Sequence, residues 1–390
     1  MKKENNVFIK NISINIILLG IVSFLNDLSS EMILPILPMF IASLGGAGIA
    51  VGLIGGVRES VTSLLKVVSG YISDKTGKRR RLVFTGYFLS SIFKVMLALS
   101  KAWQHVLLFI GLERIGKGLR DAPRDAIIAE SMPQAKGKGF GIHRAFDTAG
   151  AILGSILAFI LFWFMGLEFR TIILISAAIG FTSLIPIYFV KEHKVEKKDI
   201  TLKVTLLGLP RKLKLFLAIS ALFALANFSY MFFILRAQTV FVAKYSVGVP
   251  ILLYILFNIF YAGLAIPFGY LSDKIGRKKV LLMGYSLFAV TSLGFSCCSS
   301  ITMYIILFAA YGTVKAMVDA NQRAFVSDLS DGYVQGTSLG AYHTVTGLVA
   351  LPASVFAGML WEIAPGVAFI YAAIFSTIAA VILFLKKNKL

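Results

Sequence analysis

The sequence predicts an all-α membrane protein with twelve transmembrane helices, arranged as two six-helix halves. Three observations predict this fold class: an apolar composition, a series of apolar runs of membrane-spanning length, and a polar segment that occurs twice. The 390 residues are 57% hydrophobic and 15% charged, whereas a soluble protein holds about 25% charged residues. The mean hydropathy is +0.82, which excludes an ordinary soluble domain.

The apolar runs give the predicted helices. A helix needs roughly 20 mostly apolar residues to cross a bilayer. We place twelve such stretches at 13–43, 49–72, 83–100, 103–128, 140–164, 170–190, 214–243, 250–271, 280–297, 301–324, 337–361 and 366–385. The first follows a polar, lysine-bearing start without an evident small-residue cleavage site, so we expect an uncleaved helix and not a signal peptide.

The repeated polar segment begins at Gly70 and again at Gly269, 199 residues later, and each copy lies between two apolar runs. In each copy the first glycine would let two helices approach closely. An aspartate would then sit at a helix end, and a second glycine would permit a tight turn. The residues that we single out are Gly70, Asp74, Lys75, Gly77 and Arg79, and Gly269, Asp273, Lys274, Gly276 and Arg277.

The repeat extends beyond these hairpins and predicts two halves. Arg124 matches Arg323 at the same offset, and Gly141 matches Gly340. The polar, basic stretch 191–213 separates six apolar runs from six others. We therefore expect an N-terminal half over 1–190, a cytoplasmic linker over 191–213 and a C-terminal half over 214–390, with a substrate cavity between the halves.

The net charge of +20 would suggest a nucleic-acid partner in a soluble protein. Here its placement favours another interpretation, because the predicted outer loops carry few basic residues, Lys101, Arg170 and Lys244, while the inner segments carry many. This asymmetry predicts a multi-pass protein of the cytoplasmic membrane with both termini inside. Contact with anionic lipid headgroups follows, and nucleic-acid binding does not.

The paired hairpins resemble the signature loop of the major facilitator superfamily, and the resemblance covers the whole chain. Pro35-Ile-Leu-Pro38 is similar to the end of helix one in twelve-helix drug:proton antiporters. Arg114-Ile-Gly-Lys117-Gly118 is similar to their helix-four motif, with Lys where Gln is usual. The resemblance implies a monomeric secondary transporter that is not an enzyme and needs no cofactor.

Helix five carries Gly141, Gly150 and Gly154 at the antiporter spacing, although Ser155 stands where that branch has proline. Gly150 and Gly154 also form a small-residue face, which by itself predicts close helix packing.

Ionisable residues inside the membrane are functional candidates by default. Most of them lie in the first four predicted helices, so we expect ion coupling there and an apolar, aromatic wall in the C-terminal half. The candidates for proton coupling or substrate binding are Asp27, Glu31, Arg58, Glu59, Glu113 and Arg114.

Asp27 lies about halfway along helix one, and Glu31 shares its face because the two are four residues apart. Asp27 could exchange a proton or bind a cation, or it could serve a structural hydrogen-bond network with Asn26. In the family the arginine that matches Arg114 is linked to proton transfer. The alternative is a permanent ion pair. Arg58 and Glu59 are adjacent and therefore point in different directions.

A second charged group is predicted at the inner ends of helices four and five, where Arg120, Arg124 and Asp147 lie. We expect an inner gate, an ion-pair lattice that forms in the outward-open state and includes the hairpin aspartates. Arg124 is the preferred partner of Asp74, and Arg323 would be the partner of Asp273. The alternative is anchoring at the lipid headgroups.

The sequence thus predicts alternating-access transport of a small solute, with proton-coupled efflux of an amphipathic or cationic compound as the first hypothesis. The alternative is transport of an organic anion, because cations outnumber acids in the membrane. The arrangement of Arg58, Arg114 and Arg236 distinguishes the two: an anion site needs them to converge, whereas acidic partners would neutralise them. The sequence has no phosphate-binding Gly-rich loop, and its four histidines lack metal-ligand spacing.

Overall fold

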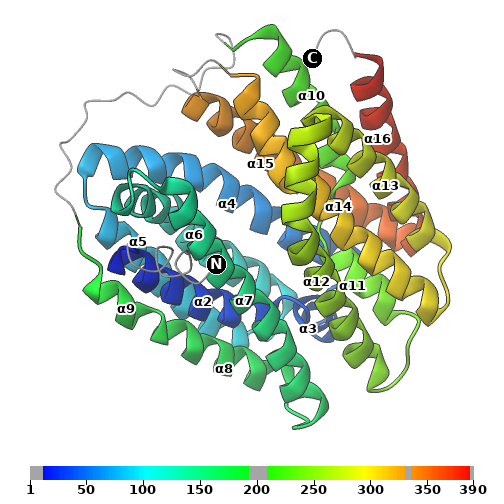
Figure 1. Ribbon diagram of the computed structural model, residues 1–390. Coiled ribbons are helices and arrows are strands. Elements are labelled where there is room, and N and C mark those ends of the chain that lie inside the picture. Colours follow the sequence, from blue (N-terminus) through cyan, green and yellow to red (C-terminus); the bar gives the residue numbers. More distant parts are fainter. Residues whose placement is uncertain (1–11, 193–208, 331–334, 387–390) are drawn as a thin grey trace, which may run out of the picture. The chain divides into compact units, whose positions relative to one another are not determined.

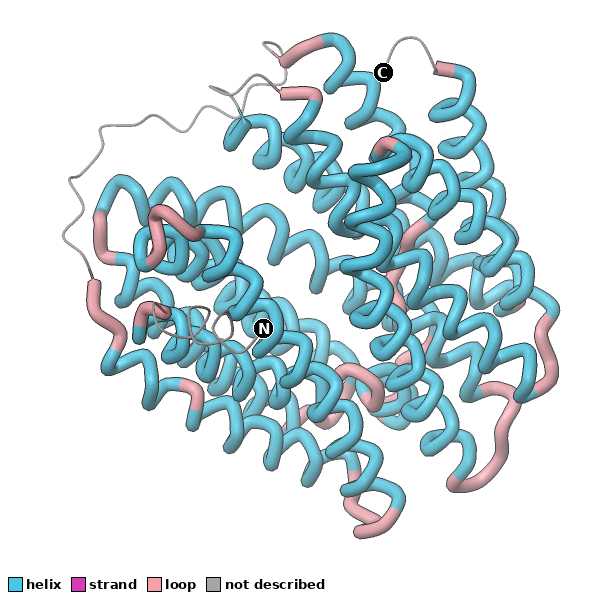
Figure 2. Tube along the Cα trace, viewed as in Figure 1, coloured by secondary structure: helices cyan, strands magenta, loops and turns pink. Residues whose placement is uncertain are grey.

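The computed structural model describes residues 12–192, 209–330 and 335–386, and this part of the chain contains helices and loops but no strand (Figures 1 and 2). The helices up to the linker are α2 (Ile14–Ile33), α3 (Leu37–Ser43), α4 (Gly48–Thr76), α5 (Arg79–Ala98), α6 (Trp103–Ser131), α7 (Lys136–Trp163), α8 (Phe169–Thr182) and α9 (Leu184–Phe189). Those after it are α10 (Arg211–Ala226), α11 (Met231–Gln238), α12 (Tyr245–Ile275), α13 (Arg277–Cys297), α14 (Ile301–Asp328), α15 (Gln335–Ile363) and α16 (Pro365–Leu385).

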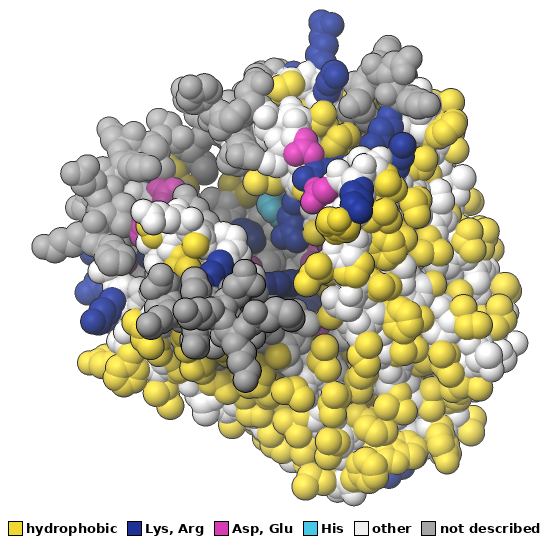
Figure 3. Space-filling view, viewed as in Figure 1, with side chains coloured by type: hydrophobic (Ala, Val, Ile, Leu, Met, Phe, Trp, Pro, Cys, Tyr) yellow, Lys and Arg dark blue, Asp and Glu magenta, His cyan; other side chains and the backbone are white. Residues whose placement is uncertain are grey.

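Eleven helical spans in the described residues are long and apolar enough to cross a membrane. α6, which matches the remaining predicted stretch, has 29 residues but carries more charge than such spans usually do. The visible surface is largely hydrophobic (Figure 3). Large apolar side chains such as Ile266, 83% exposed, would face water in a soluble protein. The prediction of an all-α membrane protein is confirmed.

The first apolar stretch of each predicted half is interrupted. α2 ends at Ile33 and α3 begins at Leu37, and Pro35 lies in the break. Proline has no N–H to donate to a preceding helical turn, which explains the interruption. In the other predicted half, α10 ends at Ala226 and α11 begins at Met231. No proline lies between these two residues, so the sequence does not predict this second break.

The described residues form two compact units. The first contains α2, the part of α4 from Leu65, α5, the part of α6 from Phe109, and α7–α9. The second contains α3, the part of α4 up to Leu64, and α10–α16. The halves predicted at 1–190 and 214–390 stay a prediction.

Within the second unit, α4 packs against α15 along a seam of small residues. Gly48, Gly52 and Gly56 lie four residues apart and therefore share one face of α4. A Cβ atom at Gly52 would collide with the backbone of Ser354, and one at Gly358 would collide with the backbone of Gly48. The seam thus brings the two backbones into contact, as small residues do between membrane helices.

Polar contacts continue the seam on both sides. The Ser60 hydroxyl donates to the carbonyl oxygen of Gly347 (2.5 Å), and the backbone N–H of Ile49 donates to Glu362 (3.2 Å). The Ser354 hydroxyl also accepts from the N–H of Ser229, in the break between α10 and α11 (3.2 Å). The seam therefore fixes three segments at one place.

A methyl group in the seam should separate the helices. We expect Gly52→Ala to lower the free energy of unfolding by about 1–3 kcal/mol, the usual cost of overpacking. Thermal unfolding of the purified protein in detergent measures this. Gly263→Ala on α12 is the matched control, because a Cβ there would meet no other atom within 4 Å. Equal melting temperatures of the two variants would contradict the seam.

Candidate functional site

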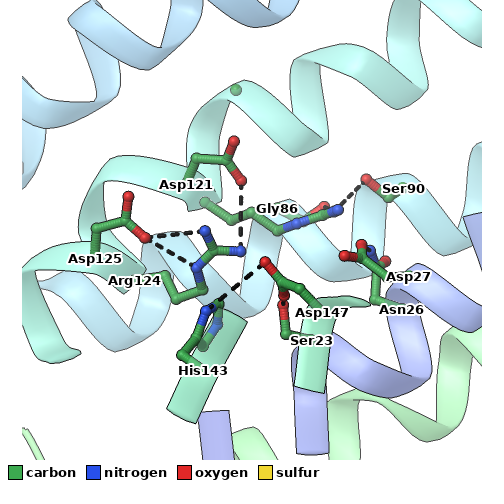
Figure 4. A network of polar contacts seen from close by, with 12 residues as sticks. Ser23, Asn26, Asp27, Gly86, Ser90, Asp121, Arg124, Asp125, His143 and Asp147 are labelled. Carbon is green, nitrogen blue, oxygen red and sulfur yellow. Dashed lines mark hydrogen bonds and ion pairs between the residues drawn. The ribbon is translucent and has the colours of Figure 1, made fainter. Parts of the chain in front are cut away.

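The candidate site lies in the first unit, where charged residues of α6 and α7 approach α2 (Figure 4). Asp27, about two-thirds of the way along α2, is half-buried. Its carboxylate accepts a long hydrogen bond from the Asn26 side chain (3.4 Å) and has no ion pair among the described residues. The nearby charges that act on it are those of Asp147, Lys117, Arg120 and Arg124.

Asp147 lies beside Asp27 and is held much more firmly. The Ser23 hydroxyl on α2 donates to one of its carboxylate oxygens. His143 and Arg144, one turn earlier on α7, lie 3.8 Å and 3.6 Å from the other. The Asp147 carboxylate is therefore held by several partners, whereas the Asp27 carboxylate has one long hydrogen bond.

Glycines bring these two carboxylates together. A Cβ atom at Gly150 would collide with the backbone of Phe24, and one at Gly154 would collide with that of Leu28. The close packing of α7 on α2 therefore requires both glycines, as their small-residue face predicts. Because α7 approaches so closely, Asp147 reaches α2 at the level of Asp27.

Arg120 on α6 is a buried cation of the site, and it is 2% exposed. Its guanidinium donates to the Ser90 hydroxyl (2.6 Å) and to the carbonyl of Gly86 (3.5 Å), and lies 4.1 Å from the ring centre of Tyr87. It makes no ion pair within the described parts of the chain. An acid, Asp27, and a cation, Arg120, thus lie near one another without an ion pair between them.

Arg124 has different partners from the predicted one. It bonds to Asp125 (2.9 Å) and lies 3.8 Å from Asp121, both on α6. Asp74, for which it was expected, instead pairs with Arg79 (3.2 Å). A lattice that includes Asp74 and Arg124 stays a prediction.

Each hairpin is tied to the end of a neighbouring helix by one arginine. Arg79 joins Asp74 to Glu130, near the end of α6. Arg277 joins Asp273 (3.1 Å) to Asp328, the last residue of α14 (2.5 Å).

The hairpin glycines make the expected turns but not the expected close helix contacts. Gly77 and Gly276 have positive φ angles of 67° and 96°, so each makes the expected turn. Gly70 and Gly269 make no close helix approach, since a Cβ at Gly70 would meet Ala122 at an ordinary 3.5 Å and one at Gly269 would meet no atom within 4 Å.

The Lys75 and Lys274 amino groups each lie over a tyrosine ring of their own helix, at 5.7 Å and 4.6 Å. Arg323, the expected partner of Asp273, is exposed and donates to the Asp319 carbonyl (3.1 Å).

The remaining candidates of the first unit have local partners. Arg114 pairs with its neighbour Glu113 (2.7 Å), and both are buried. Glu31 lies against Gly154, with its Cβ 3.0 Å from where a glycine Cβ would be. Lys94, another membrane cation, is held by the hydroxyls of Ser29 (2.8 Å) and Ser30 (3.0 Å).

The candidates Arg58 and Glu59 lie in the second unit, as does the further membrane cation Arg236. Arg58 donates to the Tyr230 hydroxyl (3.0 Å) and lies 3.8 Å from Glu59, whose side chain is exposed. Arg236 donates to the backbone carbonyls of Phe295 (3.0 Å) and Ser296 (3.3 Å). Each of these cations is thus bound locally.

A family model of the Major Facilitator Superfamily matches residues 19–251 and 242–389. The chain belongs to the major facilitator superfamily. An MFS-type transporter of Methanocaldococcus jannaschii is 52% identical over 385 residues, which are 98% of this chain and 97% of that one. The multidrug resistance protein MdtH of Shigella dysenteriae serotype 1 is 29% identical over 135 residues, 34% of this chain and 32% of that one.

Solved transporters share the fold. The nucleoside transporter NupG has a TM-score of 0.78 at 15% identity, over 96% of this chain and 98% of its own. The POT family transporter PepTSo has a TM-score of 0.80 at 12% identity, over 95% and 97%. The predicted two-halves fold is confirmed, and so is the prediction that this superfamily member is a transporter and not an enzyme.

The two hairpin arginines of this transporter should differ in their energetic importance. The Arg79 side chain is 8% exposed and that of Arg277 is 26% exposed. Arg79→Gln should lower the free energy of unfolding by about 1.5–3 kcal/mol, the usual worth of hydrogen bonds to charged groups, because the buried guanidinium that joins two half-buried acids is lost. Arg277→Gln should cost less than about 1 kcal/mol, as exposed pairs do.

Thermal unfolding of both variants in one detergent measures the difference. Equal losses would show that burial does not set the strength of these pairs.

Proposed function

We propose that this transporter couples the movement of a small solute to protons at Asp27. The observation that carries the proposal is a half-buried carboxylate within a membrane-spanning helix. It lies beside Asp147 and near Arg120 without an ion pair among the described residues. A charge in that position is costly unless it is paired or hydrated. Binding a proton removes that cost.

The neighbouring charges supply the two states that coupling needs. Two carboxylates close together readily share one proton, because both cannot be charged without repulsion. Without the proton, Asp27 is drawn to the cations of α6, Lys117 and Arg120. An arginine stays charged and does not carry the proton itself. Proton binding therefore changes which arrangement of α2 and α6 is favoured, and the populations of the two access states shift with it.

Efflux of an amphipathic or cationic compound is the direction and substrate that we propose. The partial similarity to multidrug resistance proteins MdtH supports it, as do the motifs of helices one and four. The alternative of an organic anion is less well supported: Arg114 pairs with Glu113, Arg58 lies near Glu59, and Arg236 binds backbone carbonyls.

We further propose a cell-membrane location with both termini in the cytoplasm, and a monomer with halves at 1–190 and 214–390 joined by the linker 191–213. The distribution of basic residues supports the orientation.

Proton flux in inside-out vesicles with a preset pH gradient tests the coupling. Adding tetraphenylphosphonium, a lipophilic cation, should collapse the gradient in vesicles with the wild-type protein. Asp27→Asn should reduce the collapse to the level of empty vesicles, because the neutral side chain can no longer exchange a proton. Glu168→Gln, a carboxylate change just before α8, is the matched control and should behave as the wild type does.

Other outcomes would overturn the proposal in different ways. Collapse that survives in Asp27→Asn but not in Asp147→Asn would move the coupling site to α7. Collapse with benzoate but not with the cation would favour the organic anion. Silence with both compounds would remove the support for proton-coupled efflux.

The adjacent cysteines test the orientation. Cys297 ends α13 and is exposed, while Cys298 is buried, and burial raises the pKa of the Cys298 thiol. Because thiolates react with maleimides, a membrane-impermeant maleimide should label Cys297 from outside in intact cells. Cys297→Ser should lose most of the label and Cys298→Ser should keep it. Labelling from the cytoplasmic side alone would reverse the proposed topology.

A further inference from the structure

The second unit contains a membrane-embedded ion pair that the proton-coupling site does not use. Lys315 and Asp319 lie one turn apart on α14, with 3.0 Å between the Lys315 Nζ and an Asp319 carboxylate oxygen. The hydroxyl of Tyr261 on α12 donates to the other oxygen (3.3 Å). α14 runs from Ile301 to Asp328, so the pair lies near the middle of the span.

The pair is neither sealed in the protein nor free in water. The Lys315 and Asp319 side chains are 24% and 30% exposed. Charges exposed to lipid tails at mid-membrane are very costly, so this exposure indicates a polar space beside the pair. Other membrane cations are bound differently: the Arg236 guanidinium donates to backbone carbonyls.

A second, independent observation lies on the neighbouring helix. Asn258 is buried, with 9% of its surface exposed, and its amide nitrogen has no hydrogen-bond partner among the described residues. It lies three residues before Tyr261, so the two share a face of α12. A buried donor without a partner is unfavourable, so this face of α12 carries an unsatisfied polar group one turn from the tyrosine that binds the pair.

The surroundings of the pair are aromatic and firmly packed. Tyr311, one turn before Lys315, stacks on Phe233 and Phe257, with ring centres 4.1 Å and 4.8 Å away. The Tyr261 ring stacks on Phe257 at 6.2 Å. A Cβ at Gly312 would collide with the α12 backbone at Phe257, so α12 and α14 pack closely here. The charged groups are thus presented from a rigid wall.

We propose that Lys315, Asp319 and Tyr261 bind a zwitterionic solute, one that carries both an ammonium and a carboxylate group. The inference goes beyond the proposed function, because it assigns a binding site in the second unit to a different class of solute. A solute with one charge would separate the pair and leave the other member without a partner in a poorly solvated place. A zwitterion replaces both members at once: its ammonium binds Asp319, and its carboxylate binds Lys315.

Tyr261 orients such a solute. The Tyr261 hydroxyl holds the Asp319 carboxylate in place and offers a ring against which an apolar side chain can lie. An amphipathic amino acid or a compound of similar charge fits this set of groups.

Three indole compounds that differ in charge test the proposal on the purified full-length protein. They are L-tryptophan, a zwitterion, tryptamine, a cation, and indole-3-propionate, an anion. Calorimetric titration should show that L-tryptophan binds at least about 10-fold more tightly than either singly charged compound, a difference well above the error of a dissociation constant. L-leucine should also bind, since the charges and not the ring define the site.

The variants separate recognition from structure. Lys315→Gln and Asp319→Asn should each weaken L-tryptophan binding at least about 10-fold. The exchange variant, Lys315→Asp with Asp319→Lys, keeps an ion pair and the melting temperature but should still lose binding, since the Tyr261 hydroxyl then faces a cation in place of the carboxylate to which it donates. Glu168→Gln is the matched control and should bind as the wild type does.

Two results would overturn the inference. Equal affinities for the three indole compounds, or no binding of either amino acid, would exclude a zwitterion site. Full binding by the exchange variant would show that the pair is structural. The assay needs no proton gradient, so a protein that binds L-tryptophan but fails the vesicle test would keep this site and lose the proposed coupling.

Discussion

The cost of a charge inside the membrane governs this structure. Every buried ionisable side chain must be paired, hydrogen-bonded or hydrated, and the chain meets that requirement in different ways: Arg114 by a neighbouring acid, Arg236 by backbone carbonyls, Lys94 by two hydroxyls. Against this background Asp27 and Arg120 stand out. They are close enough to interact yet not joined, and an arrangement of this kind can respond to a proton because its charges are not already neutralised by fixed partners.

Glycine contacts determine where those charges meet. Membrane helices gain little from the hydrophobic effect when they associate, so close backbone packing contributes much of their affinity. Gly150 and Gly154 draw α7 onto α2, which carries Asp147 to Asp27. Gly52 does the same for α4 and α15 in the second unit. Close packing at the glycines of α7 therefore also determines which charged side chains lie next to one another.

The sequence predicts the parts of this structure that depend on local or periodic signals. Apolar length predicted the spans, the repeat predicted the two halves, and the spacing of Gly150 and Gly154 predicted a packing face. Charge partners were harder to predict, because they depend on how distant helices rotate. Arg124 finds its acids within α6, at Asp121 and Asp125, and not at Asp74. The break after Ala226 was missed as well, since no proline marks it.

The sequence separations between the two hairpins differ for the aspartates and for the arginines that bind them. The aspartates Asp74 and Asp273 are 199 residues apart, but Arg79 and Arg277 are 198 apart, and so are their second partners, Glu130 and Asp328. Donor and acceptor have shifted by one position together, while the bond between them is present in both copies. The two hairpins thus make the same kind of contact with arginines that stand at different positions of the repeat. An alignment of the two copies by position would pair Arg79 with Lys278 and miss the equivalence altogether.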